Sequence, residues 1–275
     1  MRILLIATNR HQRLMSRMNA FPAPIGLAYI AGYLDPERHD VKILDLMFSE
    51  DYLDETERAV RELKPDLIGI SLRNLDNVSY MDPQWTLPGT REVIDKVRSI
   101  TQAPIVCGGP GFSLLPEACF DYLEPDLGVA GDGGESFAQL ADAMESGETY
   151  LNMPGLVYRD GSGSIVRQGL AYSEFSKSPR LEQLDMARYE KAGFGIGVVT
   201  KLGNAFSNSI IAENDTRSWR VLRPIEEVID DIRDLRDRFS LRKIFFIDSG
   251  FNVPLPYAKA LCRSIMEADL KVHWN

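Results

Sequence analysis

The sequence predicts an α/β protein whose first part is a doubly wound, flavodoxin-like (Rossmann-like) domain. Short apolar runs alternate with helical patterns five times within residues 1–150. The runs are rich in Ile, Leu and Val and lack polar alternation, as expected for parallel strands buried on both faces. Five such units favour an open, doubly wound sheet. We therefore expect this domain over 1–150, a β-hairpin and linker over 151–193, and a partial β/α barrel segment over 194–275.

The elements of the first domain follow from the apolar runs and the prolines that bound them. The expected strands are Ile3–Thr8, Val41–Leu46, Leu67–Leu72, Ile105–Gly108 and Leu127–Ala130. The expected helices are Ile25–Leu34, Glu55–Leu63, Arg91–Ile100, Pro116–Leu123 and Ser136–Met144. The first of these helices starts after Pro24 and stops before Pro36, because proline suits a first helical turn and disfavours helical geometry in the residue before it.

The later elements begin with a hairpin, since two apolar runs within residues 155–167 flank the turn Asp160–Gly163. Residues 176–193 form a linker with a short helical turn. The expected strands after it are 194–199, 243–247 and 271–274, and the expected helices are 224–238 and 256–268. These two and a half β/α units do not close a barrel. Their open strand edge, near Lys271–Asn275, must be covered by the first domain, another copy or a protein partner.

Charge and composition exclude several classes of function. The formal net charge of −9 argues against a nucleic-acid surface, which needs a concentrated basic face. No apolar run reaches the roughly 18 residues of a membrane span, and Met1-Arg2 leads directly into a strand rather than a signal peptide. The cysteines Cys107, Cys119 and Cys262 lack metal-like spacing and suit small buried hydrophobes. Sparse, unpaired cysteine indicates a cytoplasmic protein.

Glycine-rich and polar loops follow most of the predicted strands. Ligands of open parallel sheets lie beyond the carboxyl ends of the strands, and glycines there let the backbone approach a bulky ligand. The candidate cofactor-binding residues are Thr8, Asn9, Pro24, Gly26, Ser71, Leu72, Arg73, Asn74, Asp76, Asn77, Gly108, Gly109, Pro110, Gly131, Asp132, Gly133 and Glu135. The glycines of any one loop are explained by the needs of an ordinary turn. Four glycine-rich or polar loops at the same edge of the sheet favour a binding site for a bulky ligand. The dinucleotide motif G-x-G-x-x-G and the phosphate-binding motif G-x-x-x-x-G-K-[ST] are both missing.

Over essentially its whole length, the chain resembles cobalamin-binding radical S-adenosylmethionine (SAM) proteins. The residues that carry the resemblance are Pro24–Ala31, Asp45-Leu46, Pro65–Ser71, Gly108–Pro110 and Gly131–Glu135. The resemblance implies a corrinoid cofactor, cobalamin. It implies that Ser71-Leu72 approach the corrin and its tail, that Gly108-Gly109 lie against the nucleotide, and that the loop from Gly131 walls the tail pocket.

The loop after the first expected barrel strand departs from that family. Radical SAM enzymes carry C-x-x-x-C-x-x-C there, but the matching residues of this chain are Asn204, Asn208 and Ile211. A [4Fe–4S] cluster is held by thiolates, which neither an amide nor an alkyl group replaces. We therefore expect no cluster and no metal held by cysteine. SAM binding and the catalytic residues remain open.

The protein is then expected to be a pseudoenzyme, an accessory subunit or an inactivated, truncated form of a methyltransferase-like enzyme. Three alternatives remain: a methyl carrier that uses cobalamin without radical chemistry, a non-catalytic scaffold for a partner, and a flavodoxin-like protein that binds an unrelated nucleotide.

Histidine and aspartate residues offer further candidates. His11 is in register with the cobalt-ligating D-x-H-x-x-G motif, but Asn9 and Leu14 replace its aspartate and glycine. An imidazole ligand needs such an orienting acceptor, so a solvent-facing loop histidine is favoured. His39 and His273 suit structural roles. Asp248 follows a strand of the last segment, where it either contacts a ligand or caps the following turn.

Overall fold

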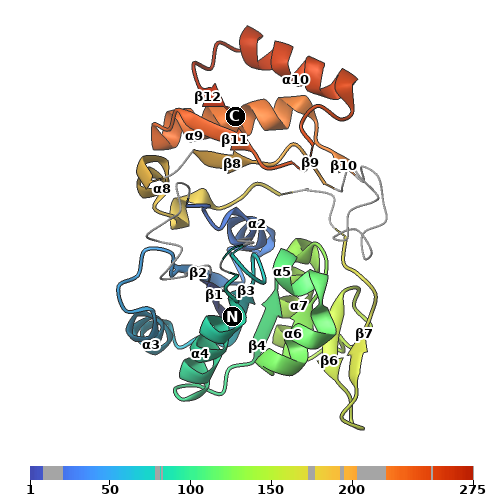
Figure 1. The fold of residues 1–275 in the computed structure, drawn as a ribbon. Helices are drawn as coiled ribbons and strands as arrows, with labels where there is room; N and C mark the ends of the chain where they lie inside the picture. The colour runs from blue at the N-terminus through green and yellow to red at the C-terminus, as the bar shows by residue number, and fades with distance from the viewer. Residues whose placement is uncertain are drawn as a thin grey trace. The chain divides into compact units, whose positions relative to one another are not determined.

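The computed structural model describes residues 1–8, 21–77, 81, 83–172, 177–192, 195–202, 221–248 and 250–274. The chain divides into two compact units, the first ending at Leu184 and the second continuing from Asp185 (Figure 1). In the part of the chain that is described, no helix is both long and apolar enough to cross a bilayer.

The first unit is built on one seven-stranded sheet. Its strands are β1 (Arg2–Ala7), β2 (Asp40–Asp45), β3 (Leu67–Ser71), β4 (Ile105–Gly108), β5 (Leu127–Val129), β6 (Leu156–Arg159) and β7 (Ile165–Arg167). They run in the order β2-β1-β3-β4-β5-β6-β7. The first five pair in parallel, and the β6–β7 hairpin adds to β5 antiparallel. The order 2-1-3-4-5 is that of flavodoxin-like sheets, which confirms the predicted fold class.

Helices cover both faces of this sheet (Figure 1). They are α2 (Ile25–Tyr33), α3 (Tyr52–Leu63), α4 (Leu87–Arg98), α5 (Pro110–Leu114), α6 (Pro116–Leu123) and α7 (Gly133–Ser146). Along β1, Leu4 and Ile6 pack into the core shared with α3, α4 and α6. Ile3 and Leu5 pack into the opposite core with α2 and α7. Because successive side chains of a strand point to opposite faces, both faces of β1 are apolar and its sequence shows no alternation.

The helices α3, α4 and α7 begin before the positions expected from their apolar periodicity. The helix α3 begins at Tyr52 because the Asp51 carboxylate accepts a hydrogen bond from the Asp54 amide at 3.0 Å. Such a cap satisfies an otherwise unpaired donor of the first turn. The five-residue helix α5 was not predicted, since so short an element has no measurable period.

The outer edge of β2 is covered by the residues that close the first unit. In the 3₁₀ turn η1 (Leu181–Gln183), the Gln183 side chain accepts from the Ile43 amide at 3.0 Å and donates to the Val41 carbonyl at 2.8 Å. The Arg180 amide also donates to Ala28 at 2.9 Å. An open strand edge can pair with another chain, and the Gln183 amide occupies this edge instead.

The second unit contains a small parallel sheet in the order β12-β11-β8 and a two-stranded pair, β10-β9. Its elements are α8 (Met186–Ala192), β8 (Ile196–Val198), β9 (Lys201–Leu202), β10 (Val221–Leu222), α9 (Ile225–Phe239), β11 (Lys243–Phe246), α10 (Leu255–Glu267) and β12 (His273–Trp274). Opposite charges pair along the solvated face of α9, for example Asp234 with Arg238 at 2.9 Å. The β9–β10 pair was not predicted, because two-residue strands leave no pattern.

Candidate cofactor site

The order of the sheet reverses between the strands β1 and β3. The next described helices after them, α2 and α4, pack on opposite faces of the sheet, and ligands of doubly wound sheets bind at such a point. The Thr8 hydroxyl donates to the Ser71 carbonyl at 3.3 Å, and its oxygen lies 2.8 Å from the Thr90 hydroxyl oxygen. These contacts tie the ends of both strands to α4.

The segments after β3 and β4 approach each other very closely. The Leu72 amide donates to the Gly108 carbonyl at 2.8 Å, and the Gly111 amide donates to the Leu72 carbonyl at 2.9 Å. Gly109 has φ +97°, and a Cβ at this position would lie 2.6 Å from the Leu72 carbonyl oxygen. Both the backbone conformation and the space therefore require glycine.

The segment after β5 is held in a similar way. Gly131 has φ +103°, and an added Cβ would lie 2.3 Å from the Ala171 carbonyl oxygen. Ser113, which the sequence analysis did not single out, links this segment to the one after β4. Its hydroxyl donates to the Gly109 carbonyl at 2.9 Å and accepts from the Gly131 amide at 2.8 Å. Its position four residues after Gly109, within a short helix, was the only signal available.

The structure brings most of the predicted cofactor residues to this one edge. Thr8, Ser71, Leu72, Arg73, Asn74, Gly108, Gly109, Pro110, Gly131, Asp132, Gly133 and Glu135 lie at or after the carboxyl ends of β1, β3, β4 and β5, whereas Pro24 and Gly26 flank the first residue of α2. Asp76 and Asn77 lie further along the β3 segment. Asn9, His11 and the former cluster positions Asn204, Asn208 and Ile211 lie outside the described residues. Contact of these residues with a cofactor stays a prediction.

Asp248 in the second unit makes contacts that the sequence did not predict, and its contact with a ligand stays a prediction. Its carboxylate accepts hydrogen bonds from the amide and hydroxyl of Thr200, at 3.1 and 2.5 Å, and lies 3.4 Å from the Lys201 ammonium. The Lys201 and Asp248 side chains are 1% and 0% exposed. The carboxylate therefore ties the end of β11 to the end of β8. Removing one partner of a buried ion pair leaves an uncompensated charge, so this contact fixes the local geometry.

Tyr257 of α10 adds hydrogen bonds to the group formed by Thr200, Lys201 and Asp248, here called the Tyr257 network. Its hydroxyl lies 3.0 Å from the Thr200 carbonyl oxygen and 2.8 Å from the Arg223 carbonyl oxygen. Burial raises the pKa of Tyr257 to about 12, and the negative charge of Asp248 adds to the effect.

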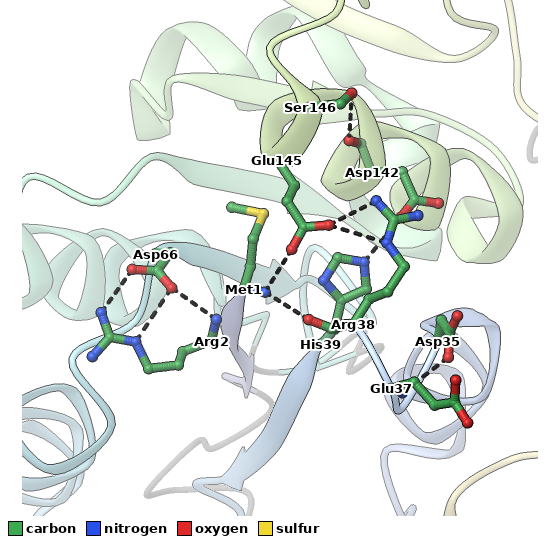
Figure 2. Close-up of polar contacts among 10 residues, drawn as sticks. All are labelled: Met1, Arg2, Asp35, Glu37, Arg38, His39, Asp66, Asp142, Glu145 and Ser146. Carbon is green, nitrogen blue, oxygen red and sulfur yellow. Dashed lines mark hydrogen bonds and ion pairs between the residues drawn. The ribbon is translucent and has the colours of Figure 1, made fainter.

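Ionisable residues also gather at the amino-terminal ends of the strands (Figure 2). The His39 Nε2 atom lies 3.1 Å from an Asp142 carboxylate oxygen, and ligand atoms of His39, Asp142 and Glu145 lie within 4.8 Å of one another. Arg38 forms ion pairs with both carboxylates. Its guanidinium compensates the charge of both carboxylates, and the cluster joins the turn before β2 to α7. His39 thus has the structural role predicted for it.

Comparison with known proteins identifies the class of the first unit. Residues 15–141 match the model of the B12 binding domain. This segment is therefore similar to B12-binding domains, and it contains β3, β4 and β5 with the loops that follow them.

The whole chain is related to a group of methyltransferases. It is 26% identical to tryptophan 2-C-methyltransferase from Streptomyces laurentii over 89% of this chain and 49% of that protein. It is 24% identical to an uncharacterized methyltransferase from Pyrococcus horikoshii over 100% of this chain and 59% of that protein. The chain thus spans about half the length of the curated relatives it matches.

Solved structures give the same relationship. The chain matches TsrM from Kitasatospora setae, a radical SAM methyltransferase solved with cobalamin and a [4Fe–4S] cluster, with a TM-score of 0.79 and 26% identity over 97% of this chain and 51% of that one. A TsrM structure with tryptophan and a SAM analog matches with a TM-score of 0.82 and 28% identity over the same shares. OxsB, at 18% identity and a TM-score of 0.74, shares the fold. The chain is therefore related to the cobalamin-dependent radical SAM methyltransferases, as its sequence indicated.

Thiol reactivity tests where the cysteines lie. Cys107 and Cys119 are buried in the first unit, whereas Cys262 on α10 is partly exposed. Burial raises the pKa of both buried thiols, that of Cys119 to about 11, and thiols react as thiolates. We expect iodoacetamide at pH 8 to modify Cys262 alone in the native protein and all three cysteines in denaturant, as read by peptide mass spectrometry. Fast native labelling of Cys107 or Cys119 would contradict this structure.

Replacing Gly109 by alanine tests the close approach of the loops. We expect Gly109→Ala to lower the free energy of unfolding by about 2 kcal/mol or more, because a Cβ there meets the Leu72 carbonyl and the backbone has positive φ. Gly89→Ala in α4 is the matched control, since its Cβ meets no atom within 4 Å. Urea unfolding measures both variants. Equal stability of the two variants would be incompatible with the geometry.

Alkaline unfolding tests the Tyr257 network. The folded pKa lies above the ordinary value of 10.0, so its contribution to stability is complete below pH 10 and is lost as the pH rises toward 12. We expect Tyr257→Phe to cost about 1 kcal/mol at pH 8 through lost hydrogen bonding. The difference between wild type and variant should shrink between pH 10 and 12. A constant difference across this range would show that Tyr257 does not titrate with a raised pKa.

Proposed function

We propose that this chain binds cobalamin at the carboxyl edge of β1, β3, β4 and β5 and does so without an iron–sulfur cluster of its own. The observation that carries the proposal is the match of residues 15–141 to the B12 binding domain. The reversal of strand order at β1 and β3 supports it, because it puts the ligand edge where the candidate loops gather.

The loops at this edge fit a large ligand. At Gly109 and Gly131 the backbone passes where a Cβ would collide with neighbouring carbonyls, so the loops present backbone groups with little side-chain bulk. We assign Ser71 and Leu72 to the corrin and its tail, Gly108 and Gly109 to the nucleotide, and the loop from Gly131 to the wall of the tail pocket. When bound, cobalamin supplies a cobalt centre suited to one-carbon transfer.

Polar side chains at the edge would orient the cofactor. Arg73 keeps solvent-exposed surface, yet the surrounding protein desolvates its guanidinium and lowers its pKa, and it forms no ion pair among the residues that the structure describes. Its guanidinium offers five N–H donors for amide or phosphate oxygens. Asn74 follows it and supplies both a donor and an acceptor. The Thr8 hydroxyl, by contrast, is already engaged with Ser71 and Thr90, so it shapes the floor of the edge.

The second unit supports binding without radical chemistry. The cluster reported for TsrM needs thiolate ligands, and the corresponding positions of this chain are Asn204, Asn208 and Ile211. Cys107 and Cys119 are buried in the first unit, and a single thiolate from Cys262 is not a cluster site. We therefore favour a pseudoenzyme or an accessory subunit of a methyltransferase system. We place it in the cytoplasm, with a protein partner or second copy at the edge of β12.

Loading with hydroxocobalamin tests the proposal. After desalting, we expect stoichiometric corrin absorbance in the wild-type protein, and iron and sulfide near background after anaerobic reconstitution. The triple variant N204C/N208C/I211C is the control for the cluster: restoring three thiolates should raise bound iron and sulfide above wild type. Corrinoid that elutes completely from the protein, or four irons per wild-type chain, would overturn the proposal.

A further inference from the structure

The segment between β3 and α4 leaves the sheet as a short excursion over residues 74–86. Its two ends are held together: the Thr86 amide donates to the Leu75 carbonyl at 2.9 Å, and the Thr86 hydroxyl donates to the Asn74 carbonyl at 2.6 Å. The root of the excursion packs against the segment after β4, where a Cβ on Gly111 would lie 2.9 Å from the Asn74 carbonyl carbon. The excursion therefore rises directly from the candidate cofactor edge.

Further contacts make the described part of this excursion a two-stranded hairpin. The Asn77 amide donates to the Gln84 carbonyl at 3.1 Å, and the Gln84 amide donates to the Asn77 side chain at 3.0 Å. Asp76 and Trp85 form an antiparallel bridge. Directly opposed residues of an antiparallel pair share a face, so the indole of Trp85 lies on the same face as Asp76, one of the predicted cofactor residues.

This hairpin carries two large apolar side chains into solvent. Trp85 is 62% exposed and Met81 is 87% exposed. A single exposed apolar residue is ordinary, but here two lie on one excursion held by backbone and side-chain hydrogen bonds. Tryptophan buries a large area at low conformational cost and retains an N–H donor for a polar partner. Small-molecule sites combine such aromatic surface with a few polar groups.

We propose that Trp85 packs against the cobalamin held at the carboxyl edge of the sheet. This inference rests on the proposed function and adds a contact that the glycine-rich loops do not provide. The loops supply backbone and hydroxyl groups, whereas a corrin also has an apolar, methyl-bearing periphery. The indole covers that periphery, and its N–H is available to the amide oxygens around the ring.

Two measurements on the full chain test the role of Trp85. The first is hydroxyl-radical footprinting of the wild type with and without hydroxocobalamin. Oxidation of Trp85 should fall roughly threefold or more when the cofactor is bound, as expected if most of the exposed indole is covered. Met266 of α10, which is 79% exposed, serves as the reference for radical dose.

The second measurement is the affinity for hydroxocobalamin, followed by its visible spectrum. Trp85→Ala should weaken binding roughly 10- to 100-fold, from the apolar area left uncovered. Trp85→Phe should recover part of the loss, and Trp274→Ala, the matched control from β12, should stay within about twofold.

The outcomes separate this inference from the proposed function. Tight binding by wild type with no protection of Trp85 and no loss in Trp85→Ala would overturn the role of Trp85 and leave cobalamin binding intact. Failure of the wild type to bind hydroxocobalamin would overturn both. The footprint needs no variant, so misfolding of Trp85→Ala would not decide the matter.

Discussion

The position of β1 between β2 and β3 is the constraint on which the first unit depends. Both faces of β1 are buried, with Ile3 and Leu5 in one core and Leu4 and Ile6 in the other. The side chains of such a strand contribute to two cores. A shift of its register by one residue would move every side chain to the opposite face of the sheet. The register of the sheet therefore fixes where β1 and β3 end, and so fixes the edge at which the candidate loops gather.

Close backbone packing and neutral hydrogen bonds, more than ion pairs, hold those loops in place. Gly109 and Gly131 remove side chains where segments cross, and Ser113 joins the two crossings through one hydroxyl. Their described contacts are chiefly neutral hydrogen bonds, and the protein carries a net charge of −9. Such a surface suits a ligand rich in amides better than a polyanion, which would need a concentrated basic face. The exposed indole of Trp85 adds apolar surface to the excursion that follows β3.

The sequence predicts β1 to β5 to within one residue, because the strands are short, largely apolar runs with clear ends. It does not predict α5 or the β9–β10 pair, which are too short to have a period. Long-range contacts also escape it: Gly128 pairs with Val157, and Asp248 meets Lys201 only after folding. The exposure of Trp85 is invisible in a sequence, where it resembles any core aromatic.

The most direct test of the central claim is a crystal structure of the full chain with hydroxocobalamin. The account predicts corrin density beyond the carboxyl ends of β1, β3 and β4, with the tail beside Gly108 and Gly109, and no cluster density near residues 204–211. Corrin bound at the amino-terminal ends of the strands, or a cluster held by this chain, would contradict it.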